Sequence, residues 1–234
     1  MVVMLHGCTQ SADDMARGTR MNAAAAASGF LVLYPEQTVA AQLLKCWNWY
    51  TAAQYARDSG EAALLAGLVD SVARAEGVAA ARVALVGMSA GAAMAANLVA
   101  AYPERYSALA MHSGLPALSA IDAAGAMSAM KNGAVGGDSL GARVIAAMGV
   151  RVRAIPVIVL HGGADKVVAP ANLDAVRRQW SRSESPRFWR NVVSRPTFPS
   201  HDPSTYKSDP PARVRPLRRV CAAGRSPERL DRLH

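Results

Sequence analysis

Short apolar runs alternate with amphipathic, alanine-rich stretches along the first three quarters of the chain. We expect the apolar runs to form β-strands, over residues 2–5, 30–34, 83–86, 108–111 and 156–160. We expect the stretches with helical spacing to form helices, from Ser11 to Gly29, over 61–76, from Ala90 onward and over 172–180. This alternation predicts the α/β class, with a mostly parallel sheet covered by helices on both faces.

Two of these helices carry clear boundary signals. Ser11 is a suitable N-cap because Asp14 stands three residues later, and Gly29 is a suitable stop. Gly77 follows an apolar stripe over 64–72. The stretch 117–149 contains no clear strand, and we interpret it as an insert beside the functional site.

The composition fits one domain with a sizeable core. The chain has 234 residues, of which 51% are hydrophobic and 18% charged. Its apolar stretches are shorter than the roughly 20 residues that a membrane span requires. We therefore predict no membrane-spanning segment and no membrane as a partner.

The formal charge of +9 is confined to the end of the chain. Residues 1–176 hold 12 basic and 12 acidic residues, whereas 177–234 hold 14 and 5, together with eight of the 13 prolines. We predict a domain over 1–180 and a basic, Pro/Arg-rich tail over 181–234 that is poorly ordered or frame-shifted. The tail has few interleaved aromatic residues and no recognition motif, so nucleic-acid binding is not predicted.

Three cysteines are too few for a disulfide framework and do not have metal-ligand spacing. One bridge, with Cys8 and Cys46 as the favoured pair, would leave Cys221 over. The first residues include neither a basic segment nor a cleavage site, so the sequence shows no signal peptide.

The strongest chemical signal is Gly87-Met88-Ser89-Ala90-Gly91, which lies between an apolar strand and a helix. In this context the G-x-S-x-G pattern predicts a nucleophile elbow, a tight turn that exposes the hydroxyl of Ser89. Small flanking residues relieve the crowding around such a turn. The structural alternative is a glycine-rich helix start with an ordinary N-cap serine.

His6-Gly7-Cys8-Thr9 follows the first predicted strand, where a loop can supply part of an oxyanion hole. The candidate donors are the backbone amides of Cys8 and of Ala90, the residue after the nucleophile. The alternative is that His-Gly forms only a turn.

His161-Gly162-Gly163-Ala164-Asp165 follows the last predicted strand. Asp165 is the candidate acid of a catalytic triad, in the chain order serine, acid, histidine. It could instead cap a turn. That order leaves His201 and His234 as the only candidates for the histidine.

Trp47 and Trp49 belong to an aromatic cluster, Cys46-Trp47-Asn48-Trp49-Tyr50. We expect the two indoles either to pack against the sheet edge or to form a wall for the acyl part of a substrate.

Six segments together resemble the polyhydroxybutyrate depolymerase-type esterases, over residues 1 to about 180. They are Val2–Gln10, Leu33–Gln37, Cys46–Trp49, Gly87–Gly91, His112–Pro116 and His161–Asp165. The resemblance implies an α/β-hydrolase that cleaves a carboxylic ester through Ser89 and Asp165, without metal or organic cofactor. It implies a small or polymeric ester as the substrate, as in the related feruloyl and acetylxylan esterases, and a location outside the cell. It predicts no particular oligomeric state.

The sequence departs from this family at both ends. Family members have further strands before the first His-Gly strand, so we expect the amino-terminal edge of the sheet to be missing. They also end their catalytic set with a His-Ala-Trp segment, which is absent near 223–226. We interpret this as a reading-frame error or an eroded end. The alternative function is an inactive hydrolase remnant or binding module that lacks the triad histidine.

Overall fold

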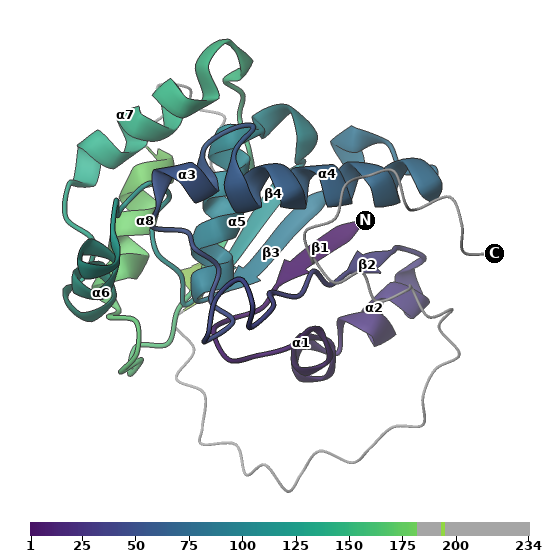
Figure 1. The fold of residues 1–234 in the computed structure, drawn as a ribbon, viewed down its shortest axis with the longest axis horizontal. Coiled ribbons are helices and arrows are strands. Elements are labelled where there is room, and N and C mark those ends of the chain that lie inside the picture. Colours follow the sequence, from purple (N-terminus) through teal and green to yellow (C-terminus); the bar gives the residue numbers. More distant parts are fainter. Residues whose placement is uncertain (182–192, 195–234) are drawn as a thin grey trace, which may run out of the picture.

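A six-stranded sheet forms the centre of the protein in a computed structural model that describes residues 1–181 and 193–194 (Figure 1). The strand order is β2-β1-β3-β4-β5-β6, and every neighbouring pair is parallel. The strands are β1 (Val2–Leu5), β2 (Val32–Leu33), β3 (Ala84–Met88), β4 (Ala108–His112), β5 (Val157–Leu160) and β6 (Val193–Ser194). All five predicted strands are therefore found, although the second is shorter than expected.

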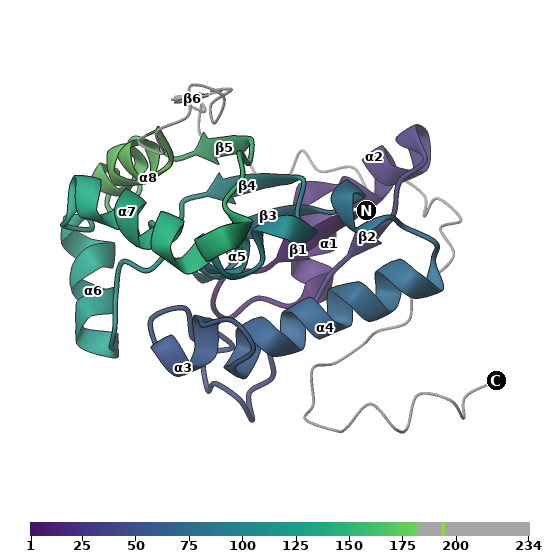
Figure 2. The same cartoon turned by 90° about the horizontal axis from the view of Figure 1, so that it is seen from above.

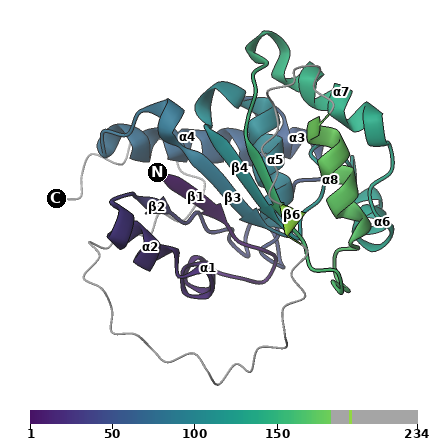
Figure 3. The same ribbon diagram turned by 180° about the vertical axis from the view of Figure 1, so that it is seen from behind.

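Helices cover both faces of the sheet, as the sequence predicts. They are α1 (Ala12–Thr19), α2 (Met21–Ser28), α3 (Ala52–Tyr55), α4 (Gly60–Ala75), α5 (Ala90–Ala101), α6 (Ala123–Asn132), α7 (Gly137–Met148) and α8 (Ala171–Ser181). The sheet lies between α4 on one side and α1 and α2 on the other (Figures 1 and 3). Seen from above, α6, α7 and α8 gather beside β5 (Figure 2).

The helix predicted from Ser11 to Gly29 is two helices. Ser11 forms the expected capping box with Asp14, and Gly29 ends α2 in a left-handed conformation with φ 68°. Between them Arg20 is also left-handed, with φ 51°, which breaks the helix. An unbroken helix would place Met15 and Ala25 about 80° apart around its axis. The break lets both pack in one cluster against β1 and β2.

The larger core lies on the other face, around α5. All 12 residues of α5 are buried, because the helix is enclosed by the sheet, α4 and α7. A helix that is buried all round is largely apolar, and the one polar residue of α5, Asn97, is hydrogen-bonded to Trp49 and Leu118. The many alanines of this helix also let the neighbouring elements approach closely.

The segment 117–149 contains α6 and α7 and no strand, as predicted. Apart from Ser181 and β6, the predicted tail over 181–234 lies outside the described residues. In the part of the chain that the structure describes, no helix has the length and apolarity needed to cross a membrane.

Candidate active site

The predicted site residues follow the carboxyl ends of strands that lie side by side. Leu5 pairs with Gly87, Met88 with His112, and His112 with Leu160. In a parallel sheet these ends meet at one edge, so the loops that begin at His6, Ser89 and His161 share that edge. The chain order also reverses between β1 and β3, and α/β sheets bind ligands at such a point.

Ser89 occupies the turn between β3 and α5. Its backbone is strained, with φ 54° and ψ −122°, and its N–H donates to the carbonyl of His112 at 2.9 Å. The residue is half-buried, and its hydroxyl has no hydrogen-bond partner among the described residues. Ser89 is thus the N-cap position of α5 but does not cap the helix with its side chain. This geometry differs from that of an ordinary N-cap serine.

Two glycines make this turn possible. A Cβ atom on Gly87 would lie 2.3 Å from the carbonyl oxygen of Gly91. A Cβ atom on Gly91 would lie 2.3 Å from the carbonyl oxygen of Leu5 and 2.5 Å from that of His6. The absence of both side chains lets α5 begin directly against β1.

The loop after β1 lies directly against the serine. A Cβ atom on Gly7 would be 3.5 Å from Cβ of Ser89. The N–H of Gly7 donates to Oε1 of Gln10 at 2.8 Å, whereas the N–H of Cys8 has no partner among the described residues. The N–H of Ala90 is the first of α5, so no carbonyl within the helix can accept it. The two predicted oxyanion donors are therefore both unused.

Asp165 is held in the loop after β5 by backbone amides. The N–H groups of Val167 and Val168 each donate to its Oδ1 at 2.9 Å. Desolvation alone would raise the pKa of Asp165, but these two donors, the Ser113 side chain and the nearby His161 together hold the pKa below its ordinary value. Asp165 does bind its own turn through Oδ1, as the structural alternative expected, and the Ser113 side chain also hydrogen-bonds to its carboxylate. Oδ2 lies 3.6 Å from Nε2 of His161.

Three histidines lie in the described part of the chain. His6 is buried and uses both ring nitrogens, and His161 is buried and donates from Nε2 to the carbonyl of Val168 at 2.9 Å. His112 is exposed at the end of β4. The two triad candidates, His201 and His234, lie outside the described residues.

The predicted disulfide between Cys8 and Cys46 is present. It joins the loop after β1 to the aromatic segment. In that segment, Trp47 and Trp49 are buried, with 1% and 3% of their surface exposed. They therefore pack in the core, which is the structural alternative, and their role as a substrate wall stays a prediction.

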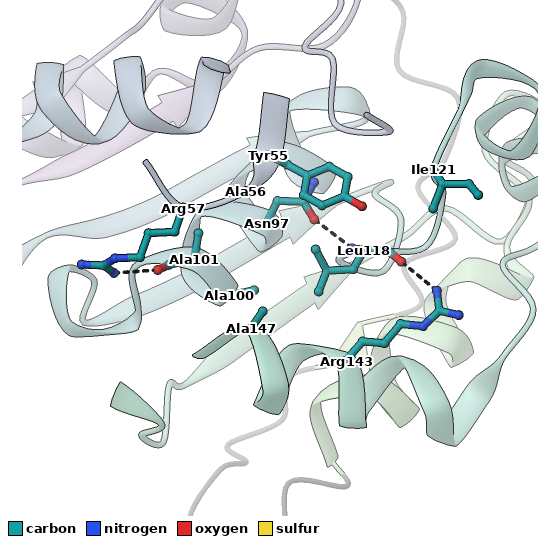
Figure 4. Close-up of a pocket in the computed structure, with 10 residues that line it drawn as sticks. All are labelled: Tyr55, Ala56, Arg57, Asn97, Ala100, Ala101, Leu118, Ile121, Arg143 and Ala147. Atoms are coloured by element: carbon teal, nitrogen blue, oxygen red, sulfur yellow. Dashed lines mark hydrogen bonds between the residues drawn. The ribbon is translucent and has the colours of Figure 1, made fainter. Parts of the chain in front are cut away.

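A pocket of about 330 Å³ lies away from Ser89, along the carboxyl-terminal half of α5 (Figure 4). Asn97 and Ala101 of α5 line it together with Arg143 of α7, which donates to the carbonyl of Leu118. At 1.5 Å per residue, this half of the helix is about 12–18 Å from the serine. None of the predicted site residues lines this pocket.

Within residues 1–181 and 193–194, no group of three or more histidine, cysteine, aspartate or glutamate side chains could hold a metal ion.

Sequence reasoning missed one polar residue beside the site, Glu61, which was assigned only to a helix. The carboxylate is buried at the start of α4 and binds Gln37 and Asn48. A signal was present, because Glu61 stands four residues before Leu65 and eight before Val69, on the buried stripe of the helix.

The parallel sheet with helices on both faces is an α/β-hydrolase fold. Two solved structures share it. An acetyl xylan esterase from Aspergillus awamori aligns with a TM-score of 0.66 at 21% identity, covering 77% of this chain and 68% of that one. The esterase PE8 aligns with a TM-score of 0.54 at 20% identity, covering 83% and 81%.

Sequence comparison identifies the family. The model of the family described as Esterase PHB depolymerase matches residues 1–187, and the chain belongs to this family. Poly(3-hydroxyalkanoate) depolymerase C of Paucimonas lemoignei is 30% identical over 186 residues, which are 77% of this chain and 44% of that protein. Acetylxylan esterase A of Emericella nidulans is 26% identical over 189 residues, 77% of this chain and 61% of that protein. The chain thus spans about half the length of these two relatives.

The close approach of Gly91 to the end of β1 can be tested by measuring the stability of a variant. Gly91→Ala should destabilise the protein by about 3 kcal/mol, because its methyl group collides with the backbone of Leu5 and His6. Urea unfolding followed by circular dichroism measures the change. Gly67→Ala is the matched control: nothing lies within 4 Å of its added methyl group on α4, so it should stabilise by about 0.5–1 kcal/mol. Equal stability of the two variants would contradict the close approach.

Proposed function

We propose that the protein hydrolyses carboxylic esters, with Ser89 as the nucleophile. The observation that carries this proposal is the elbow itself. A strained serine with an unbonded hydroxyl stands beside two unused amides, those of Cys8 and Ala90. Membership of the Esterase PHB depolymerase family supports the same chemistry.

The reaction follows from these positions. Oγ of Ser89 attacks the acyl carbonyl, and a histidine takes the hydroxyl proton and passes it to the leaving alcohol. The negative charge on the former carbonyl oxygen is stabilised by the amides of Cys8 and Ala90. Water then attacks the acyl-enzyme, so that the carboxylic acid leaves and Ser89 regains its proton. The mechanism uses no metal and no organic cofactor.

Asp165 is the proposed partner of that histidine. Two backbone amides bind its Oδ1 and lower its pKa, so the carboxylate is charged at neutral pH. Oδ2 can therefore accept the N–H of an imidazole and stabilise the imidazolium. His201 and His234 are the proposed sources of this imidazole.

The substrate we propose is a small or polymeric carboxylic ester. One relative is a poly(3-hydroxyalkanoate) depolymerase and another is an acetylxylan esterase. A third relative is feruloyl esterase B of Neurospora crassa, which is 27% identical over 208 residues, 84% of this chain and 69% of that protein. The three names specify different esters, but each describes the cleavage of a carboxylic ester bond.

We also propose that the protein works outside the cell. The Cys8–Cys46 disulfide supports this, because such bonds persist in oxidising compartments and are rare in the cytosol.

Replacing the nucleophile tests the proposed reaction. Ser89→Ala should abolish hydrolysis of p-nitrophenyl acetate and labelling by a fluorophosphonate probe, because only an activated serine reacts with the probe. Ser71→Ala, which changes an exposed serine on α4, is the control and should behave as the parent chain. A folded parent chain that neither hydrolyses the ester nor labels would contradict the proposal and favour the inactive remnant.

Replacing Asp165 tests its proposed role as the acid of the triad. Asp165→Asn should lower kcat by a factor on the order of 10³–10⁴, since an amide cannot hold the imidazole in the correct tautomer. Asp174→Asn alters an exposed carboxylate on α8, whose side chain is 49% exposed, and should leave kcat unchanged. Steady-state kinetics on p-nitrophenyl acetate measures both variants. If they had equal kcat, Asp165 would not be the acid.

Counting thiols tests the proposed location. Protein recovered from the growth medium of cells that express it should show one reactive thiol per chain after unfolding, and three after reduction, because Cys8 and Cys46 are joined. Titration with Ellman's reagent gives the number. Three thiols without reduction, or protein found only in the cytosol, would contradict the proposal.

A further inference from the structure

A buried carboxylate without a cation lies behind the loop that follows β1. Glu61 is 8% exposed, and no lysine or arginine among the described residues pairs with it. Its oxygens accept from the backbone N–H of Asn48 at 2.8 Å, from Nδ2 of Asn48 at 2.5 Å and from Nε2 of Gln37 at 2.6 Å. Burial raises the pKa of Glu61 and so disfavours its charged form. A buried charge of this kind destabilises a fold unless its hydrogen bonds compensate.

Gln37 also contacts the loop after β1, which contains the predicted oxyanion donor Cys8. The backbone N–H of Gln37 donates to Nε2 of His6 at 3.0 Å. Nε2 is therefore an acceptor, which places the ring proton on Nδ1, and Nδ1 lies 2.7 Å from the carbonyl oxygen of Gly7. The ring of His6 is thus hydrogen-bonded to Gln37 on one side and to the carbonyl of Gly7 on the other, so a displacement of Gln37 would displace that carbonyl.

That carbonyl belongs to the peptide group that also contains the N–H of Cys8. The peptide group is planar, and in its trans form the C=O and N–H bonds point in opposite directions. Holding the carbonyl of Gly7 toward His6 therefore directs the N–H of Cys8 away from His6. The N–H of Cys8 is the unused donor in this loop.

Asn48 ties a second segment to the same carboxylate. It stands between Trp47 and Trp49, and Nε1 of Trp47 donates to the carbonyl of His6 at 3.0 Å. The disulfide from Cys46 reaches Cys8 itself. Glu61 joins the two segments that hold the loop after β1, which are also linked directly by Nε2 of Gln37 donating to the carbonyl of Cys46 at 3.4 Å.

We propose that Glu61 is a positioning residue for the oxyanion hole. Through Gln37 and the neutral ring of His6, it fixes the plane of the Gly7–Cys8 peptide, and through Asn48 it fixes the segment that bears Trp47. The inference rests on the proposed function, in which the amide of Cys8 receives the negative charge of the transition state.

Kinetics of the full chain separates positioning from simple stabilisation. Glu61→Ala should lower kcat on p-nitrophenyl acetate about tenfold to a hundredfold, less than the 10²–10³ that loss of a whole donor costs. KM should change by less than about twofold, because the oxyanion contact forms in the transition state. Leu65→Ala is the matched control, since it removes a buried side chain one turn further along α4 without touching the network. It should lower the melting temperature to a similar extent and keep the parent kcat.

A conservative variant refines the test. In Glu61→Gln one oxygen can still accept from Gln37 and from Nδ2 of Asn48, whereas the new NH₂ group faces the backbone N–H of Asn48. Its kcat should lie between those of the parent and Glu61→Ala. Equal kcat for Glu61→Ala and Leu65→Ala at matched stability would overturn the proposal.

A nuclear magnetic resonance measurement decides the inference even if the chain has no activity. In ¹⁵N-labelled protein, Glu61→Ala should shift the Cys8 amide resonance, whereas Leu65→Ala should leave the resonance in place. An unshifted Cys8 amide in Glu61→Ala would refute the positioning role. If the parent lacks hydrolysis and probe labelling, the proposed function fails, and the Cys8 resonance still decides whether Glu61 sets the amide.

Discussion

The contact between α5 and the end of β1 is the constraint on which the site depends. Gly91 lies so close to the carbonyls of Leu5 and His6 that no side chain fits there, and Gly87 meets Gly91 in the same way. This contact brings the first turn of α5 against the loop after β1. Gly7 and Ser89, which lie far apart in sequence, become neighbours as a result.

The sheet supplies the rest of the arrangement without any special interaction. Parallel strands in register end at one edge, so the residues after β3 and after β5 are separated only by the width of β4. Two strand spacings amount to about 10 Å. The strand ends that lead to Ser89 and to the loop of Asp165 are thus about 10 Å apart, and in the proposed mechanism an imidazole links the two residues.

Local patterns in the sequence were enough to predict much of this. The strand over 83–86 followed by Gly-x-Ser-x-Gly encodes the elbow, because strand, turn and helix are contiguous there. The capping box at Ser11 is local as well. The break at Arg20 could not be predicted, since it results from packing Met15 and Ala25 on the same part of the sheet. The buried indoles of Trp47 and Trp49, and the contacts of Glu61, also depend on segments that meet only in the folded chain.

Glu61 has a consequence for the evolution and engineering of this protein. A leucine at that position would continue the apolar stripe of α4 toward Leu65, but it would remove the acceptor of three donors, the N–H and Nδ2 of Asn48 and Nε2 of Gln37. As long as Gln37 and Asn48 are kept, folding and the proposed positioning role both favour the carboxylate. Engineering that exchanges Glu61 alone would lose these hydrogen bonds together with the proposed geometry of the neighbouring loop.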